Sequence, residues 1–231
     1  MIDWHSHILP EMDDGSQSVH ESESMLESLK SQGASCVIAT PHFLANEESV
    51  EDFLMRRRTS YEMLMQNRDC NQFRVICGAE VKYYPGIAKM KDLEKLAIEN
   101  TKFLLLEMPM TRWTEYTVKE LIELAGVRGL TIIMAHIERY LNLQAKGTIE
   151  RLYENGLLMQ VNASFFERIG SRRKALRMLG SGMIHFIGSD CHNMTTRPPR
   201  LDSAYSIIEK NFGEYYISQM NEFGYHALGR Q

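Results

Sequence analysis

Two histidines one residue apart, His5 and His7, stand at the end of the first apolar run of this 231-residue chain. Side chains at i and i+2 point to the same side of a strand, so both imidazoles could bind one metal ion. Asp14 follows shortly afterwards, and Asp190 and His192 come from late in the chain. Imidazole and carboxylate ligands in this combination are typical of sites that activate water, so the residues indicate metal-assisted hydrolysis.

Short apolar runs alternate with longer amphipathic runs along the whole chain, which is the pattern of β-α units in series. Strands are expected over residues 2–5, 36–40, 73–78, 103–108, 131–135, 158–161 and 185–188. The fourth and fifth of these are almost entirely apolar, as buried parallel strands should be. With 44% hydrophobic residues and no linker segment, the chain is predicted to form one α/β domain over residues 1–231, a TIM-like barrel of seven β/α units.

Helices are predicted between these strands. Ser18 and Glu21 have the spacing of a capping box at the start of the first helix, and Gly33 ends it. Further helices are expected over residues 50–65, 114–128, 148–155, 172–179 and 204–211. The tail over residues 212–231 receives no assignment.

The residues that could bind metal follow the ends of successive predicted strands. In a parallel barrel the carboxyl ends of all strands open on one face, and that face carries the active site. We therefore expect nine ligands to converge there, with Asn162 beside them: His5, His7, Asp14, His42, Glu80, Glu107, His136, Asp190 and His192.

Each of these residues has an ordinary explanation when taken alone, such as a hydrogen-bonded histidine or a helix-capping carboxylate. Taken together they indicate a metal site, because Glu107 ends an apolar run where an unpaired charge would be costly. Nitrogen and oxygen ligands favour Mn²⁺, Zn²⁺ or Fe. The four carboxylates would repel an anionic substrate, whereas three divalent ions would make the site attractive to phosphate.

Two arginines, Arg139 and Arg197, are expected on the same face. The planar guanidinium matches phosphate oxygens, so we interpret both as catalytic residues that bind phosphate, with surface ion pairs as the alternative. Cys191 and Arg197 also have the C-x5-R spacing of thiol-dependent tyrosine phosphatases. That chemistry needs a phosphate-binding loop leading into a helix, and Pro198-Pro199 follows here instead, so a cysteine nucleophile is not expected.

Composition excludes several classes of protein. A net charge of −4 and a pI of about 6.1 argue against nucleic-acid binding, and the basic run at residues 56–58 is interpreted as a solvated helix face. Four cysteines without a C-x-x-C pair are interpreted as reduced thiols. With no signal peptide and no membrane-length apolar run, we expect a cytoplasmic protein without membrane insertion. A homo-oligomer is compatible with the sequence.

The motifs in order resemble those of the CpsB/YwqE-type manganese-dependent protein-tyrosine phosphatases of the polymerase and histidinol phosphatase (PHP) superfamily. The resemblance extends from Met1 to about Ala204. It rests on the following segments: His5-Ser6-His7-Ile8-Leu9-Pro10, Asp13-Asp14-Gly15, Ala39-Thr40-Pro41-His42, Gly78-Ala79-Glu80, His136 with Glu138-Arg139-Tyr140, Gln160-Val161-Asn162-Ala163-Ser164, and Ser189-Asp190 with His192-Asn193 and Arg197.

The resemblance implies a distorted seven-stranded barrel with two to three divalent ions, Mn²⁺ with Fe or Zn as alternatives. One ion would be bound by His5, His7, Glu80 and Asp190, a second by Glu80, Glu107 and His136, and a third by Asp14, His42 and His192. It also implies hydrolysis of phosphotyrosine by a metal-activated hydroxide. The substrate would be a phosphotyrosine protein, namely the tail of a bacterial tyrosine kinase that controls capsule or exopolysaccharide synthesis.

One departure from the family pattern concerns Phe165 and Phe166, which stand where smaller residues are usual. They would either shape the pocket for an aromatic ring or simply pack a helix. Three other functions stay open: a histidinol-phosphate phosphatase or another PHP phosphoesterase, a non-catalytic regulator that binds phosphotyrosine, and an amidohydrolase. The last usually needs a bridging lysine where this chain has Glu107.

Overall fold

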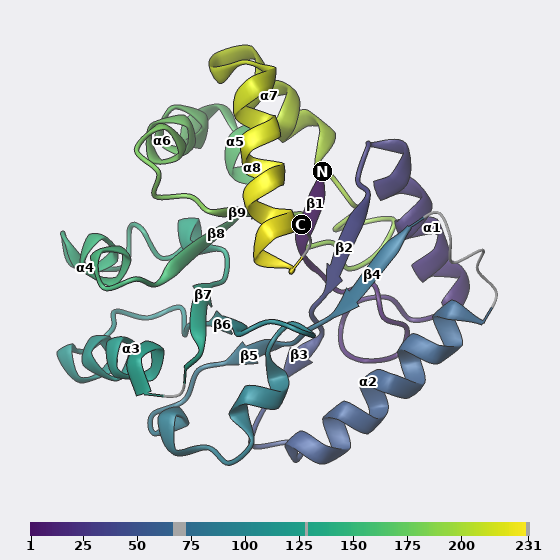
Figure 1. Ribbon diagram of the computed structural model, residues 1–231, viewed down its shortest axis with the longest axis horizontal. Helices are drawn as coiled ribbons and strands as arrows, with labels where there is room; N and C mark the ends of the chain where they lie inside the picture. The colour runs from purple at the N-terminus through teal and green to yellow at the C-terminus, as the bar shows by residue number, and fades with distance from the viewer. Residues whose placement is uncertain (67–72, 128, 230–231) are drawn as a thin grey trace.

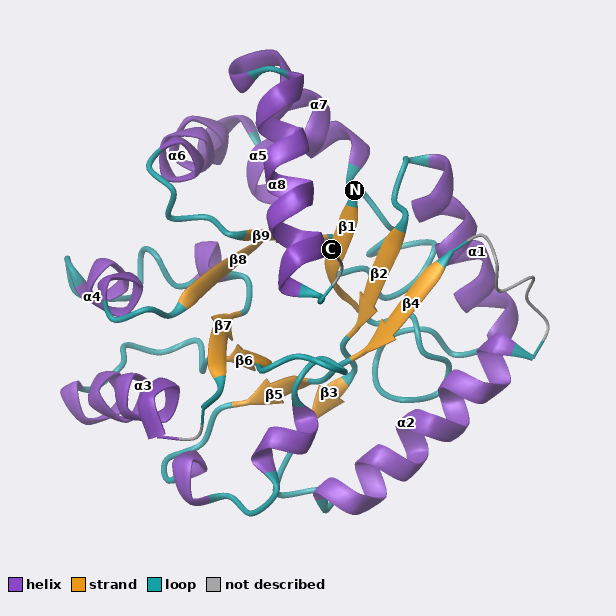
Figure 2. Cartoon of the chain, viewed as in Figure 1, coloured by secondary structure: helices purple, strands orange, loops and turns teal. Residues whose placement is uncertain are grey.

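The computed structural model describes residues 1–66, 73–127 and 129–229. Within these residues the chain alternates strands with helices, and the strands curl around a common centre with the helices outside (Figures 1 and 2). Two residues covered by the predictions above lie outside the described residues: Cys70, one of the four cysteines, and Arg128, which ends the helix predicted over 114–128.

All strand pairs in the described residues are parallel. A three-stranded sheet has the order β1-β2-β4 and contains β1 (Ile2–Ser6), β2 (Cys36–Ala39) and β4 (Arg74–Cys77). The other sheet has the order β3-β5-β6-β7-β8-β9. Its strands are β3 (His42–Phe43), β5 (Glu80–Lys82), β6 (Phe103–Glu107), β7 (Thr131–Met134), β8 (Leu158–Asn162) and β9 (Phe186–Gly188).

The two short strands β3 and β5 correct the prediction of seven simple strands. Each continues a predicted strand after a break of two residues, β3 after β2 and β5 after β4. The breaks stay hydrogen-bonded, because the backbone N–H of Gly78 donates to the Ala39 carbonyl and that of Glu80 to the Pro41 carbonyl. Each broken strand therefore belongs to both sheets, and the break turns the pair His42 and Glu80 onto the second sheet.

The far edges of the two sheets meet where β1 approaches the segment after β9. The backbone N–H of Asp190 donates to the His5 carbonyl at 2.8 Å, and that of His7 donates to the Cys191 carbonyl at 2.9 Å. The result is a curled parallel sheet in which Asp190 and Cys191, from late in the chain, lie against the first strand.

A bulge in β1 gives its side chains two roles. Asp3 pairs with Val37 and Ser6 pairs with Ala39, so β1 has one more residue between these pairs than β2 has. The extra residue shifts the alternation of side chains. Trp4 therefore joins the inner apolar cluster, a set of buried side chains that includes Ile2, Leu105 and Phe186, and its ring stacks on that of Phe186. The histidines that follow face the carboxyl end of the sheet.

The helices cover the outer face of the sheet (Figure 1). In chain order the main helices are α1 (Val19–Ser31), α2 (Val50–Met65), α3 (Glu115–Val127), α4 (Thr148–Glu154), α6 (Ile169–Gly180), α7 (Asp202–Phe212) and α8 (Glu214–Ala227). Shorter turns of helix are α5 (Ser164–Glu167), η1 (Ile87–Lys89), η2 (Leu93–Leu96) and η3 (Ile137–Arg139). Ser18 caps α1 as predicted, but the Glu21 carboxylate accepts from the backbone N–H of Gln17 instead of that of Ser18.

The C-terminal tail, to which the sequence assigned no role, forms α8. This helix packs where the strands begin, away from the predicted metal ligands. Gly224 lies against Ile2 and Trp4, Phe223 stacks on Phe186, and Leu228 joins the inner apolar cluster. The helix therefore covers the end of the inner core that lies opposite the carboxyl ends of the strands.

Arg57 corrects the interpretation of the basic run as a solvated face. Its side chain is buried, and its Nη1 donates to the Gly78 carbonyl at 2.7 Å, so it supports the break between β4 and β5. Arg56 and Arg58 do pair with nearby glutamates on the surface. Among the described residues, the helices are too short or too polar to cross a lipid bilayer.

Candidate metal centre

The predicted ligands all lie at the carboxyl end of the curled sheet. His5 is on β1 with His7 just after it, His42 begins β3, Glu80 begins β5 and Glu107 ends β6. His136 and Asp190 follow β7 and β9 with φ angles of 31° and 53°, a left-handed conformation that is unfavourable for residues other than glycine. Backbone strain of this kind is held in place by its surroundings and is typical of functional sites.

Glu80 lies at the centre of the cluster and is almost completely buried. Its Oε2 is 3.1 Å from His5 Nε2, 3.3 Å from His7 Nε2 and 3.1 Å from His42 Nδ1. Its Oε1 is 2.8 Å from His136 Nε2. Burial raises the pKa of this carboxyl, but His5 and its other histidine partners lower it well below the ordinary value, so Glu80 is ionised.

Asp190 and Glu107 extend the cluster on either side of Glu80. Asp190 Oδ1 lies 3.8 Å from His5 Nε2 and 3.6 Å from His7 Nε2, and Asp190 is buried. Glu107 Oε1 lies 3.7 Å from His136 Nε2, and the Glu107 side chain keeps 16% of its surface exposed. Burial and the neighbouring Glu80 raise the pKa of Glu107.

Asp14 and His192 complete the set on the open side. Asp14 Oδ1 lies 3.5 Å from His42 Nε2 and 3.3 Å from His192 Nε2, and the Asp14 side chain is 65% exposed. The His192 ring packs on that of His7 with their centroids 3.9 Å apart. The structure therefore brings all nine predicted ligands together.

Three groups of side chains place their ligand atoms within 4.8 Å of one another. They are His5, His7 and Asp190; His42, Glu80 and Glu107; and His7, Asp14, His42 and His192. The resemblance implies another division of the same side chains, with His7 and His42 at one ion each and His136 with the two glutamates. The distances are compatible with that division as well, because His136 Nε2 lies 2.8 Å from Glu80 Oε1 and 3.7 Å from Glu107 Oε1.

The donor set fits divalent metal ions on its own chemistry. His192 Nε2 is buried and forms no hydrogen bond within the described residues, although Asp14 Oδ1 lies 3.3 Å away, and a metal ion between the two atoms would satisfy both. His5 Nε2 and His7 Nε2 face each other at 3.2 Å, with the Glu80 carboxylate against both. Converging imidazole nitrogens and carboxylate oxygens of this kind are the ligands of Mn²⁺, Fe and Zn²⁺.

Two residues outside the predicted set hold the ligands in place. Asp13 Oδ2 lies 2.7 Å from His7 Nδ1 and accepts from the backbone N–H of His42 at 2.8 Å. Gln160 Oε1 accepts from the backbone N–H of His136 at 2.6 Å and lies 3.4 Å from His5 Nδ1. Both residues belong to the motifs noted above, but the contacts of Asp13 with His42 and of Gln160 with His5 and His136 join distant parts of the chain, so spacing in the sequence could not assign them this role.

Two glycines allow the ligands to approach the backbone. A Cβ at Gly188 would lie 2.5 Å from the Cβ of His5, and one at Gly15 would lie 2.4 Å from the His7 carbonyl oxygen. Distances this short are not tolerated between non-bonded atoms. Glycine is therefore required at both positions for the two histidines to sit where they do.

Arg139 and Arg197 reach the site from opposite sides of Asp190. Arg139 Nη2 contacts Asp190 Oδ2, and Arg197 Nη2 contacts Asp190 Oδ1 at 2.7 Å. Both arginines, which the sequence predicts to bind phosphate, are thus held by the same carboxylate. Their side chains keep 36% and 39% of their surface exposed, so both remain open to a ligand at the rim.

Cys191 is unsuited to act as a nucleophile. The residue is fully buried, and burial raises the pKa of its thiol well above the usual value, so the thiolate needed for attack does not form near neutral pH. The C-x5-R spacing is therefore a coincidence of two residues with separate roles.

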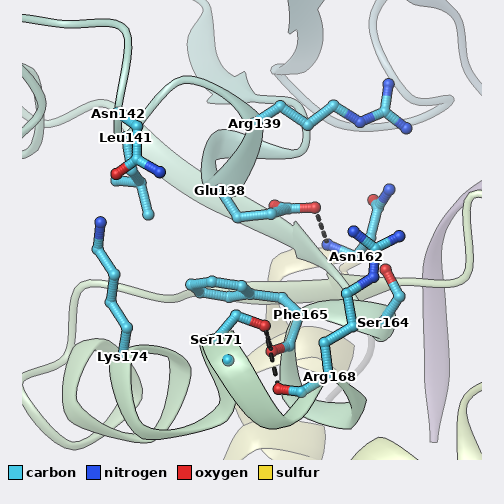
Figure 3. Close-up of a pocket in the computed structure, with 11 residues that line it drawn as sticks. Glu138, Arg139, Leu141, Asn142, Asn162, Ser164, Phe165, Arg168, Ser171 and Lys174 are labelled. Atoms are coloured by element: carbon cyan, nitrogen blue, oxygen red, sulfur yellow. Dashed lines mark hydrogen bonds between the residues drawn. The ribbon is translucent and has the colours of Figure 1, made fainter.

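Within the described residues, two cavities adjoin the cluster of predicted metal ligands. One of about 390 Å³ is lined by Asp190 and Arg197, and one of about 710 Å³ is lined by Phe165 and Arg168, with Arg139 in the wall of both. The two phenylalanines have different surroundings. The Phe165 ring lies at the larger cavity (Figure 3), whereas Phe166 is fully buried in the core.

Comparison with known proteins finds relatives that match nearly the whole chain. The family described as "Capsular polysaccharide synthesis, CpsB/CapC" matches residues 1–223. Tyrosine-protein phosphatase CpsB of Streptococcus agalactiae serotype III is 29% identical over 232 residues, which cover 95% of this chain and 94% of the relative. Tyrosine-protein phosphatase YwqE of Bacillus subtilis is 30% identical over 220 residues, covering 92% of this chain and 85% of the relative.

Solved structures extend the comparison to three dimensions. A chain from the crystal structures of YwqE from Bacillus subtilis and CpsB from Streptococcus pneumoniae, described as unique metal-dependent tyrosine phosphatases, matches with a TM-score of 0.78 and 26% identity. The match covers 100% of this chain and 96% of the other. The phosphotriesterase homology protein of Escherichia coli matches at a TM-score of 0.50 and 10% identity over 94% of both chains, a likeness of fold alone.

Proposed function

The chain belongs to the CpsB/CapC family of capsular polysaccharide synthesis proteins, and on that premise we propose that it is a metal-dependent tyrosine-protein phosphatase. The observation that carries the proposal is the convergence of nine imidazole and carboxylate side chains, with Glu80 at their centre and two arginines at the rim. Such a site suits hydrolysis of a phosphate ester without a covalent enzyme intermediate.

The ions would be held by the three groups of side chains around His7, His42 and Glu80. We propose Mn²⁺ as the metal, in two to three positions, with Fe or Zn as alternatives. When bound, divalent ions would lower the pKa of water enough to supply hydroxide as the nucleophile near neutral pH.

The chain's own residues then have distinct tasks. Arg139 and Arg197 bind phosphate oxygens and stabilise the negative charge that spreads over them in the transition state. Asp190 orients both guanidinium groups because each of its oxygens accepts from one of them. Asp13 and Gln160 fix the rings of His7 and His5 through their Nδ1 atoms, so that both Nε2 atoms face Glu80.

Tyrosine phosphate suits this machinery because its leaving group is a phenolate, with a pKa of about 10, which needs less protonation than an alkoxide does. We propose that the substrate is a phosphotyrosine protein, namely the tail of a bacterial tyrosine kinase in capsule or exopolysaccharide synthesis. The names of the relatives support the reaction and the capsule link. A cytoplasmic location, a distorted (β/α)7 barrel of the PHP type and a homo-oligomeric state belong to the same proposal.

The decisive experiment is hydrolysis of a phosphotyrosine peptide by the purified protein after Mn²⁺ loading. We expect turnover that EDTA abolishes and that iodoacetamide leaves intact. Asp190→Ala should lose nearly all turnover, whereas Glu222→Ala, a change of an exposed acid on α8, should not. Sensitivity to iodoacetamide together with resistance to EDTA would reject the metal mechanism.

Two alternative functions are separated by the same assay. Faster hydrolysis of histidinol phosphate than of the phosphotyrosine peptide would assign the chain to the histidinol-phosphate phosphatases. Tight binding of the peptide without turnover under any metal loading would indicate a phosphotyrosine-binding regulator.

A further inference from the structure

The two cavities beside the predicted metal ligands share part of their lining. Arg139, Asn162, Ser164 and Arg168 contribute to both of them. The smaller one includes Asp190, whereas the larger one extends away from the ligands along α5 and the start of α6. At about 710 Å³ the larger cavity falls within the range of ligand-binding pockets and exceeds what one phosphate group needs.

Two cations that line the larger cavity have no partner within the described residues. Within the described residues, the side chains of Arg168 and Lys174 make no hydrogen bond or ion pair, although both line the larger cavity. By contrast Arg172, on the same helix, donates to the carbonyls of Phe166 and Glu167. Arg139 is already engaged by Asp190. Unpaired cations in a concave surface are suited to an anionic ligand.

The acidic groups of the lining are less available than these cations. Glu138 Oε1 accepts from the backbone N–H of Asn162, and its Oε2 is buried without a partner, away from solvent. Glu167 Oε1 accepts from the Ser203 hydroxyl. The chain's own donors therefore hold the glutamates, whereas Arg168 and Lys174 stay open to the cavity.

The remaining lining is mixed, with apolar surface from Phe165 and Leu141 beside the polar side chains of Asn142, Ser164 and Ser171. The Phe165 ring lies between the Lys174 and Arg168 side chains, and Leu141 lies across the cavity from them (Figure 3). A mixture of aromatic, aliphatic and cationic groups contacts a polypeptide better than it contacts a free phosphate ion, because a polypeptide brings both apolar and charged side chains.

We propose that the larger cavity is a specificity subsite for a carboxylate-bearing residue that flanks the phosphotyrosine of the substrate. The proposal rests on the phosphatase function proposed above and specifies which peptides that site prefers. With the phosphate at Arg139 and Arg197, neighbouring residues of the peptide enter the adjoining cavity, where Arg168 and Lys174 attract their acidic groups.

The test compares kcat/KM for two phosphotyrosine peptides that differ only in their flanking residues, Glu in one and Gln in the other, at low ionic strength. The wild-type protein should prefer the acidic peptide by about fivefold or more, the ratio expected for one or two partly exposed ion pairs. The double variant Arg168→Gln/Lys174→Gln should bring the ratio close to one. Lys174→Glu should favour the Gln peptide, because it reverses a charge at the cavity.

The matched control is Arg173→Gln, which removes the same charge from an exposed position of α6 that lines neither cavity. Its ratio should equal that of the wild type, which separates local attraction from the overall charge of the protein. Equal kcat/KM values of the wild-type protein for the two peptides would overturn the subsite. A preference for the acidic peptide that survives in the double variant would overturn it as well. Failure to hydrolyse either peptide, with Mn²⁺ bound, would instead reject the phosphatase function itself.

Discussion

Asp13 accepts a hydrogen bond from His7 through a contact of 2.7 Å between Asp13 Oδ2 and His7 Nδ1. Burial alone would lower the pKa of His7, but the Asp13 carboxylate raises it to about 10. The same contact lowers the pKa of Asp13 against the effect of its own burial. Asp13 holds the Nδ1 proton, so His7 directs Nε2 toward Glu80 and Asp190, and a metal ion would take the place of the proton that Nε2 carries in the metal-free protein. A carboxylate behind a ligand histidine fixes the ring and raises its basicity.

We therefore predict that Asp13→Asn lowers the affinity of the site for metal ions while the protein still folds. Loss of a carboxylate behind a metal-binding histidine typically costs about 10- to 100-fold in metal affinity or activity. Mn²⁺ titration followed by calorimetry, with turnover of p-nitrophenyl phosphate at each metal concentration, measures both. Glu27→Gln, on the exposed side of α1, serves as the charge-matched control. Wild-type Mn²⁺ affinity in Asp13→Asn would show that the carboxylate does not act on the metal ligands.

The arginine pair gives a second prediction. Arg139→Ala and Arg197→Ala should each lower kcat/KM by about 100-fold, the usual effect of removing one donor to a developing negative charge. Each variant keeps the other arginine on Asp190, so the bound metal content should stay at the wild-type level. Steady-state kinetics, inhibition by inorganic phosphate and metal analysis separate these effects.

The control for the arginines is Arg151→Ala, which breaks a surface pair with Glu115 outside the site. Unchanged inhibition by phosphate in either site variant would remove that arginine from the phosphate-binding role. A fall in metal content equal to the fall in activity would show that the arginine acts by holding Asp190.

The sequence predicted the arrangement of the site because a simple rule applies to it. Buried parallel strands must be apolar, so polar residues such as Glu107 and Asn162 mark strand ends, and parallel strands end on the same face. The rule requires neither loop conformations nor exact strand lengths. It therefore brought together residues as distant in the chain as His5 and Asp190, whose contact the structure describes.

The rest of the structure depends on contacts that spacing does not encode. The break before Glu80 is supported by Arg57, which donates to the Gly78 carbonyl from α2. Gln160 supports His136 across two strands. The tail helix α8 is ordered by packing on Trp4 and Phe186. In each case tertiary packing decides the outcome, and local sequence patterns carry little of that information.

Close packing at Gly188 gives a third prediction. An added Cβ would lie 2.5 Å from the His5 Cβ and 2.8 Å from the His5 backbone nitrogen, and a backbone atom cannot rotate away. Gly188→Ala should lower the free energy of unfolding by about 1–3 kcal/mol and weaken metal binding by displacing His5. Gly126→Ala, in α3 with no neighbour within 4 Å of the added carbon, should instead raise the free energy of unfolding by up to about 1 kcal/mol. Urea denaturation of both variants tests the pair, and equal effects would contradict it.

His185 gives a prediction about pH away from the metal ligands. Its Nδ1 accepts from the backbone N–H of Met159 at 3.0 Å, and its ring packs against Tyr153 and Phe186. Burial lowers the pKa of His185 to about 4, so the folded state favours the neutral ring. Because the unfolded chain titrates near 6.5, the stabilisation is complete above that pH and is lost as the pH falls from about 6.5 to 4.

His185→Gln should remove this part of the pH dependence, because glutamine cannot be protonated yet still offers an oxygen to the Met159 N–H. The gap between a pKa of 6.5 and one of about 4 corresponds to at most roughly 3 kcal/mol of unfolding free energy. Urea denaturation of both proteins at pH 7 and pH 4 measures that difference, and titration of the metal ligands, common to both, cancels in the comparison. The wild type should lose up to this much more free energy than the variant between the two pH values. Parallel pH profiles would mean that protonation of His185 costs the folded state nothing.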